Sequence, residues 1–436
     1  MEERIQLTKE QAKHPGGLYV LFCVEMWERF SFYGMRALLM LYMLGVLKFS
    51  MEKSGHVYGA YTGLVYLTPL IGGYVADRYW GARKCIYIGG IFMALGHFCM
   101  AFKELPFFFT ALGLLIVGNG FFKPNISTTV GGLYKENDPR RDGGFTIFYM
   151  GINVGALTGG LLCGWLGESV GWHYGFGAAG VGMLLGLIML KLLEKKYLGD
   201  ICTKPAKCST HPGETKPDEP LTKIEKHRIA VVFILVFFTI FFWSAFEQAG
   251  SSLTVFARDS LNRNLFGWTV PASWFQNLNP FFIIVFASIF SKFWIKLAGL
   301  GKEPTTPWKF VWGLGLLGFG FVLMVFAAKS FESSGKVMMM WLVFVYLFHT
   351  LGELCLSPVG LSVVTKLAPA KFASLLMGAW FLGNFAANWV GGIFAGSYDK
   401  MSTSSFFMIP TATALGSAVL LMFLSKFIKK WMHGVH

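Results

Sequence analysis

Long apolar stretches alternate with short polar ones along almost the whole of this chain. Most of the apolar stretches run for about 20 residues or more, which is the length a helix needs to cross a bilayer. The pattern predicts an all-α polytopic membrane protein with twelve transmembrane helices. These are expected at residues 17–47, 56–77, 83–102, 106–124, 144–166, 173–194, 226–257, 270–297, 307–328, 337–366, 373–397 and 404–428.

One polar stretch divides the predicted helices into two sets of six. Residues 194–224 are rich in Lys, Pro, Glu and Thr and lack the apolar periodicity of a folded domain. We therefore expect an N-terminal six-helix bundle at 1–193, a cytoplasmic linker at 194–224 and a C-terminal six-helix bundle at 225–436. Two such halves suit a transporter whose binding site lies near the bilayer midplane.

The distribution of charge adds one feature to this prediction, the orientation of the chain in the membrane. The chain is 54% hydrophobic and 14% charged, against about 25% charged in soluble domains. Of the 38 Lys and Arg residues, 27 fall at the termini and in the even-numbered loops, 8 on the opposite side and 3 within spans. This asymmetry predicts cytoplasmic termini. The net charge of +14 thus reflects topology, and no nucleic-acid partner is expected. The polar N-terminal residues lack the apolar segment of a cleaved signal peptide.

The chain offers little for enzymatic or metal chemistry. Its seven cysteines include no CxxC pair, and Cys202 and Cys208 in the linker have no partners at zinc-ligand spacing. Free thiols are expected. No span carries an HExxH motif or a Ser–His arrangement. We expect no enzyme activity, no metal and no cofactor, with protons as the only coupling ion.

Seven ionisable residues fall well inside the predicted spans. Each costs at least ~2.5–3.5 kcal/mol at the bilayer centre, so such residues pair with one another or face a cavity. Structural ion pairs remain an alternative for any single residue, but a near-balanced set on four helices favours function. The seven are Glu25, Glu28, Arg29, Arg36, Lys123, Glu247 and Glu353.

The first span carries the densest group of these charges. Glu25, Glu28 and Arg29 are spaced i, i+3, i+4 and therefore share one helix face, which Tyr33 and Arg36 continue. Two carboxylates beside one guanidinium cannot both be neutralised by it. One of the acids is thus a candidate for taking up and releasing a proton.

Motifs along the chain resemble those of one transporter family. The stretch "EMWERFSFYG" at 25–34 resembles the ExxERFxYYG motif of the proton-dependent oligopeptide transporter family, a branch of the major facilitator superfamily. Six further stretches resemble signatures of the same family, in the same order. They are "GGYVADRYWGARK" (72–84), "GNGFFKPN" (118–125), "FTIFYMGINVGAL" (145–157), "FFWSAFEQAGSS" (241–252), "NLNP" (277–280) and "GELCLSPVGLSVVTKLAP" (352–369).

The resemblance implies a fold and a function. The fold would be the major facilitator fold, two six-helix bundles around a central cavity. The protein would import di- and tripeptides with protons by alternating access, as a functional monomer in a bacterial inner membrane. Bacterial members commonly insert two extra helices between the halves, but the linker here is too short for them. Phe32 stands where the motif usually has a tyrosine.

The resemblance also implies residue roles. Proton coupling would fall to Glu25, Glu28, Arg29 and Glu247. Gating would use the pairs Arg36–Glu247 and Lys123–Glu353, with Asp77 and Arg78 in a cytoplasmic latch near Arg83 and Lys84. Peptide binding would use Tyr33, Arg36, Tyr66, Lys123, Asn153, Trp243, Asn279, Glu353, Trp380, Phe381 and Asn384.

Two other functions remain open at this point. Arg36 and Lys123 would also suit nitrate or another small anion on the same fold, whereas Glu353 favours a substrate with a cationic amine. A peptide-sensing receptor without net transport is the other alternative, although a receptor would have no use for paired gates.

Overall fold

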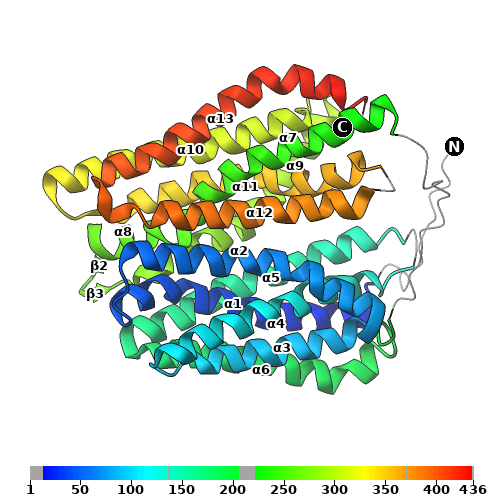
Figure 1. Cartoon of the computed structure of the whole chain (residues 1–436), viewed down its shortest axis with the longest axis horizontal. Helices are drawn as coiled ribbons and strands as arrows, with labels where there is room; N and C mark the ends of the chain where they lie inside the picture. Colours follow the sequence, from blue (N-terminus) through cyan, green and yellow to red (C-terminus); the bar gives the residue numbers. More distant parts are fainter. Residues whose placement is uncertain (1–12, 136–137, 206–220, 370–371, 435–436) are drawn as a thin grey trace. The chain divides into compact units, whose positions relative to one another are not determined.

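The computed structural model describes residues 13–135, 138–205, 221–369 and 372–434 of the chain. Within these ranges, twelve helices have 18 or more residues and account for most of the fold (Figure 1). They are α1 (Gly16–Gly45), α2 (Met51–Val75), α3 (Ala82–Cys99), α4 (Leu105–Gly131), α5 (Arg141–Trp165), α6 (Trp172–Tyr197), α7 (Lys223–Phe246), α9 (Leu278–Gly299), α10 (Thr306–Ser334), α11 (Met340–Leu367), α12 (Ala373–Ala395) and α13 (Thr403–Trp431).

Short elements join the long helices. Two two-residue strand pairs form, β1 (Leu261–Asn262) with β4 (Val337–Met338) and β2 (Asn264–Leu265) with β3 (Trp268–Thr269). The remaining short helices are η1 (Ala76–Trp80), η2 (Leu166–Val170), η3 (Glu247–Gly250), α8 (Ser252–Ser260), η4 (Ala272–Asn277) and η6 (Tyr398–Lys400).

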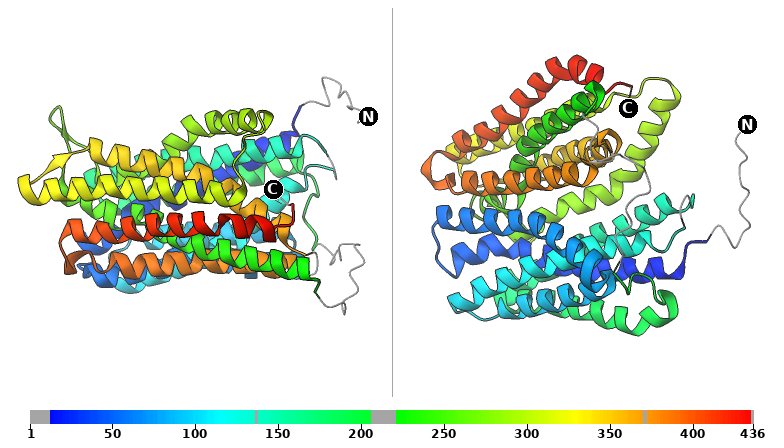
Figure 2. Two further views of the ribbon diagram at one scale, coloured as in Figure 1. Left: turned by 90° about the horizontal axis from the view of Figure 1, so that it is seen from above. Right: turned by 45° about the vertical axis from the view of Figure 1, so that its right-hand side comes forward.

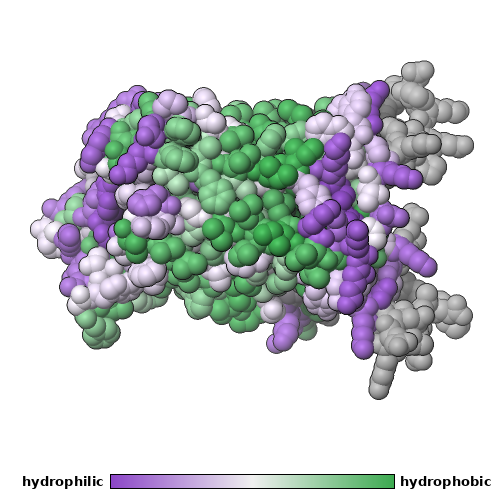
Figure 3. Space-filling view, turned by 90° about the horizontal axis from the view of Figure 1, so that it is seen from below, coloured by the Kyte–Doolittle hydropathy of each residue, from purple (hydrophilic) through white to green (hydrophobic). Residues whose placement is uncertain are grey.

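Eight helical segments in the described residues are long and apolar enough to cross a membrane. The helix α1 is not among them because it carries Glu25, Glu28, Arg29 and Arg36 within twelve residues. On the face seen in Figure 3, apolar residues gather over the middle parts of the helices and polar residues at their ends. The predicted all-α polytopic membrane class is confirmed, and the number of twelve crossings stays a prediction.

The chain folds into two compact units that do not follow the sequence halves at every point. Unit 1 comprises 1–35, 68–163 and 173–209, and unit 2 comprises 36–67, 164–172 and 210–436. The second half of α1, the first part of α2 and the α5–α6 turn thus belong with the C-terminal helices. The predicted bundles at 1–193 and 225–436 stay a prediction. Residues 206–220 of the predicted linker, with Cys208, lie outside the described residues.

Close backbone contact between helices organises unit 1, because several contact positions are glycines. A Cβ built on Gly72 of α2 would lie 1.9 Å from the carbonyl oxygen of Gly120 on α4. Nearby, the Thr68 hydroxyl donates to the Ile116 carbonyl at 2.9 Å, and the Asn125 amide donates to the Gly72 carbonyl at 3.3 Å. Small residues thus allow α2 and α4 to pack backbone to backbone, as is common in membrane helices.

This contact makes Gly72→Ala a sharp test of the packing. The added methyl cannot fit beside the Gly120 backbone, so the helices must separate, and we expect a destabilisation of about 1–3 kcal/mol. Gly73→Ala is a matched control on the same helix, because its Cβ would meet only the Pro124 Cβ at 3.8 Å. Thermal unfolding in detergent measures both variants. Equal midpoints for the two would contradict the close packing of α2 against α4.

Aromatic side chains fill the interior of unit 2. The helices α7, α10 and α13 lie side by side there in both Figure 1 and Figure 2. Phe242 of α7, Phe321 of α10 and Phe407 of α13 are all completely buried. Phe407 lies within ring contact of Phe321, at a centroid separation of 6.4 Å.

The predicted span at 226–257 lies within one helical segment, Lys223–Ser260, that is long and apolar enough to cross a membrane. The helix α7 ends at Phe246, and the chain continues through a 3-10 turn at Glu247–Gly250 into the short helix α8. At this turn a Cβ on Gly250 would lie 1.7 Å from the Tyr58 hydroxyl oxygen, so only glycine lets the backbone pass this close to Tyr58.

Candidate transport site

Both acids of the first motif lie against a single guanidinium in unit 1. The Arg29 Nε lies 2.7 Å from Glu25 Oε1 and 2.8 Å from Glu28 Oε2. All three side chains are buried, with 5%, 2% and 0% of their surface exposed for Arg29, Glu25 and Glu28. The shared helix face predicted from the i, i+3, i+4 spacing is therefore present, and it points into protein rather than lipid.

Three neighbours complete this acid–base group. The Asn119 amide donates to Glu28 Oε1 at 3.4 Å, and the positive charge of Lys123 acts on the Glu28 carboxylate. The Arg29 guanidinium also lies over the buried Phe32 ring, 5.9 Å from its centroid. With both acids ionised, Arg29 and Lys123 balance the two negative charges.

Glycines on α5 hold α1 in place behind this group. A Cβ on Gly155 would lie 2.1 Å from the Met26 carbonyl oxygen, and one on Gly159 would lie 2.2 Å from the Phe30 carbonyl oxygen. Asn153 on the same helix is buried and donates to the Tyr149 carbonyl at 3.2 Å. The charged face of α1 is thus fixed by contact of two helix backbones.

Arg36, one helical turn beyond Tyr33, belongs to unit 2. Its Nη2 forms an ion pair with Glu247 Oε2, and its Nε donates to the Tyr58 hydroxyl at 2.8 Å. The pair is largely buried, with 13% of the Arg36 and 9% of the Glu247 side chain exposed. The ion pair expected between these residues is present. It joins α1 to the break between α7 and α8.

Glu353 on α11 is held by a neutral amide, whereas the acids described above are held by guanidinium groups. Its Oε2 accepts a hydrogen bond from the Asn279 amide at 2.8 Å, and the same amide lies 3.1 Å from the Thr350 hydroxyl oxygen. The Thr350 hydroxyl in turn donates to the Tyr346 carbonyl at 2.7 Å. The cation predicted to pair with Glu353 is Lys123, which belongs to unit 1. That pair stays a prediction.

The other predicted binding residues of unit 2 lie on α2, α7 and α12. Trp243 packs against the aromatic core and meets the Phe246 ring edge-on at 5.3 Å. Trp380 is buried, whereas Tyr66, Phe381 and Asn384 are half-buried. The Asn384 amide donates to the Trp380 carbonyl at 3.2 Å. Their binding roles stay predictions.

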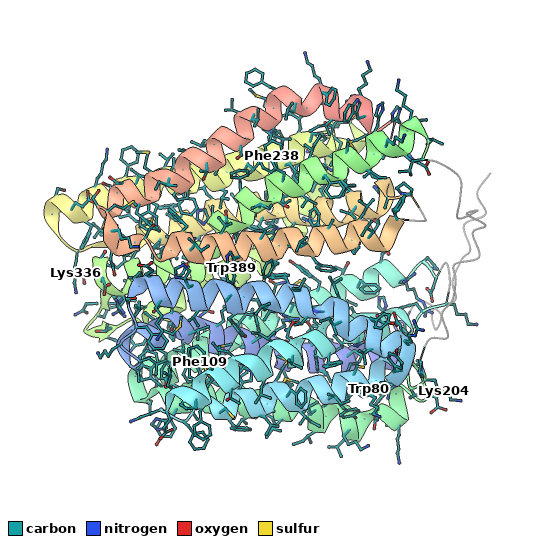
Figure 4. The ribbon with its side chains drawn as sticks, in the orientation of Figure 1. Trp80, Phe109, Lys204, Phe238, Lys336 and Trp389 are labelled. Atoms are coloured by element: carbon teal, nitrogen blue, oxygen red, sulfur yellow. The ribbon has the colours of Figure 1, made fainter. Side chains whose placement is uncertain are left out.

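The predicted latch residues Asp77 and Arg78 lie exposed in the turn η1. The Arg78 guanidinium donates to the Tyr74 hydroxyl at 3.1 Å. The buried cation at this end of unit 1 is Arg83, which donates to Glu194 at 3.1 Å and to the Ile201 carbonyl at 2.8 Å. Figure 4 shows Trp80 and Lys204 at this same end, away from Phe109.

Cys202 shares this end of unit 1. Its carbonyl accepts a hydrogen bond from the Arg83 backbone at 3.0 Å. Burial raises the pKa of the Cys202 thiol above its ordinary value. Cys202 is a free cysteine, as expected at this position.

Several residues that contact the charged side chains were not predicted from the sequence. Thr350 lies one turn before Glu353 and Asn119 one turn before Lys123, so shared helix faces were an available signal. Glu194, the partner of Arg83, and Tyr58, the partner of Arg36, gave no local signal. Arg83 and Glu194 lie 111 positions apart, and Arg36 and Tyr58 lie 22 positions apart on consecutive helices, beyond the range of any helical spacing.

Buried ion pairs inside a bundle of membrane helices define a class of protein. Such charges are costly in lipid and mark the pathways of ions and polar substrates, so the chain is a polytopic membrane transporter. A model of the POT family matches residues 83–199 and 215–414, and the chain belongs to this family. It is therefore a transporter and not an enzyme.

Three relatives illustrate the match. The peptide transporter YePEPT of Yersinia enterocolitica is 36% identical over 94% of this chain and 94% of its own length. A di-/tripeptide transporter of Lactococcus lactis subsp. cremoris is 33% identical over 97% of each chain. The crystal structure of a peptide transporter POT in complex with sulfate superposes with a TM-score of 0.90 at 33% identity, covering 97% of this chain and 96% of that one. The family predicted from the motifs is confirmed.

Proposed function

We propose that this protein is a proton-coupled symporter that imports di- and tripeptides by alternating access. It works as a monomer in a bacterial inner membrane, with twelve crossings and both termini in the cytoplasm. The family membership and the names of two relatives, a peptide transporter and a di-/tripeptide transporter, support the substrate class.

The acid pair on Arg29 carries the proton-coupling part of the proposal. Glu25 and Glu28 lie within 2.8 Å of one guanidinium nitrogen, away from solvent. An unbalanced charge in such a place costs several kcal/mol. The positive charge of Lys123 acts on Glu28, and in this proposal it balances the second negative charge of the group. If a substrate carboxylate engages Lys123, a proton on Glu28 restores the balance.

The proposal that the substrate is a peptide rests on separated charges of both signs. A peptide is a zwitterion and needs a cationic site for its carboxylate and an anionic site for its amine. Arg36 and Lys123 supply cations, and Glu353, held by Asn279 at 2.8 Å, supplies the anion. Nitrate or another small anion would have no use for Glu353.

The proposed cycle follows from these contacts. Protonation of Glu247 releases Arg36 from its ion pair and opens the outer side. The entering peptide engages Arg36, Lys123 and Glu353, and the outer pair then reforms. Proton loss from the Glu25 and Glu28 group toward the cytoplasm accompanies release of the peptide.

Uptake of labelled dialanine into proteoliposomes tests this function. An inward proton gradient is expected to drive accumulation, and collapse of the gradient with an uncoupler is expected to remove it. Unlabelled dialanine should compete and nitrate should not. Accumulation that ignores the gradient would overturn the coupling. Competition by nitrate alone would overturn the substrate class.

A further inference from the structure

A carboxylate from the α5–α6 turn binds the start of a distant helix. Glu168 lies in η2, and its two oxygens accept from the backbone amides of Ala272 and Ser273, each at 2.8 Å. These amides open η4, which continues directly into α9. Only 16% of the Glu168 side chain is exposed, so this contact is shielded from solvent. We call it the Glu168 clasp.

The start of η4 is a favourable position for a carboxylate. The first amides of a helix have no partner within it. The preceding residue, Pro271, supplies no side-chain hydrogen bond to them in the described structure. The positive end of the helix dipole also favours an anion. Glu168 accepts hydrogen bonds from these amides and places a negative charge at this end of the helix, although it lies 104 positions earlier in the chain.

Two further contacts fit the turn against η4. A Cβ on Gly164 would lie 2.4 Å from the Ser273 hydroxyl oxygen, so only glycine allows the end of α5 to come this close. The Arg263 guanidinium lies 3.8 Å from Glu168 and donates to the Val270 carbonyl at 2.6 Å. Arg263 directly precedes the β2–β3 hairpin seen beside α8 in Figure 1.

We propose that the Glu168 clasp is a second outer gate, beside the Arg36–Glu247 pair. This inference rests on the proposed function and topology, in which the α5–α6 turn and the start of η4 face the outside and belong to different six-helix halves. Alternating access requires the halves to part on that side when a peptide enters. The clasp joins them, so it must break in each cycle, and it favours the outward-closed state.

A second carboxylate provides a matched comparison. Glu332 on α10 accepts from the Ser404 backbone amide at 2.7 Å and from the Ser404 hydroxyl at 2.8 Å, at the start of α13. The chemistry is that of the Glu168 clasp, but α10 and α13 both belong to the second half. Loss of this contact should lower stability without opening the outer side.

Accessibility of a cysteine at position 273 tests the gate. Ser273 is completely buried, so Ser273→Cys should react slowly with an impermeant maleimide added outside right-side-out vesicles. Background labelling of the native cysteines is measured in the protein without Ser273→Cys and is subtracted. Adding Glu168→Gln or Glu168→Ala is expected to raise the labelling rate about fivefold or more, as loss of a helix cap implies. Adding Glu332→Gln is expected to leave it unchanged.

Labelling that is unchanged in both Glu168 variants, or that rises equally with Glu332→Gln, would overturn the gate. Dialanine uptake in the same vesicles separates this result from the proposed function. If labelling responds to Glu168 while dialanine is not carried, the gate stands and the substrate is wrong. If dialanine is carried and labelling does not respond, the function stands and the gate is wrong.

Discussion

Glu25→Gln is expected to reduce proton-driven accumulation of dialanine to about a tenth or less of the wild-type level, while exchange of labelled for unlabelled peptide continues. Glutamine matches glutamate in size but carries no negative charge, so a substrate carboxylate on Lys123 is then balanced without a proton on Glu28. Arg29 keeps a carboxylate at 2.8 Å, because Glu28 remains. The loss should therefore fall on the coupling of peptide transport to protons and not on peptide binding.

Two assays on the same proteoliposomes separate coupling from binding. One measures accumulation under an inward proton gradient, and the other measures counterflow with no gradient. Glu303→Gln is a suitable control, because Glu303 pairs with Lys309 at 2.5 Å but has a side chain that is 43% exposed. This control should match wild type in both assays.

Gradient-driven accumulation that survives in Glu25→Gln would remove this residue from the coupling group. Loss of counterflow together with accumulation would instead mean that Glu25 maintains the structure of α1. The second result would favour the interpretation of the first-helix charges as a structural ion pair, since removing one partner of a buried pair typically costs about 3–5 kcal/mol.

Periodicity was sufficient to predict most helices, because lipid allows few alternatives to a helix of about 20 apolar residues. It was also sufficient to place Glu25, Glu28 and Arg29 on one face, since their spacing is local. It placed a span at 226–257, within the segment Lys223–Ser260, but it did not predict that α7 ends at Phe246 inside this segment. Just after this end the backbone at Gly250 packs against Tyr58, which comes from a helix nearly 200 positions away and leaves no trace in the local pattern.

The same limit applies to the partners of the charged residues. The pair Arg36–Glu247 was accessible only through the resemblance to a family, because no local spacing relates positions 36 and 247. The contacts Arg83–Glu194 and Glu168–Ala272 were not predicted at all. Each joins segments more than 100 positions apart, and each depends on how closely glycine-rich helices approach.

Glu353→Gln is expected to weaken dialanine binding by about 10- to 100-fold, the effect of losing one charged hydrogen-bond partner. The amide oxygen of glutamine can still accept from Asn279, which now donates to Glu353 at 2.8 Å, so the local structure should survive. Only the negative charge that would meet the peptide amine is removed. The measurement is the concentration of unlabelled compound that halves counterflow of labelled dialanine.

An analogue without the amine makes this prediction specific. N-propionyl-alanine keeps the peptide bond and the carboxylate of dialanine but lacks the amino group. Wild type should prefer dialanine strongly, whereas Glu353→Gln should bind the two compounds about equally. If the variant weakens both compounds by the same factor, Glu353 does not recognise the amine. The anion that separates a peptide site from a nitrate site would then have to lie elsewhere on the chain.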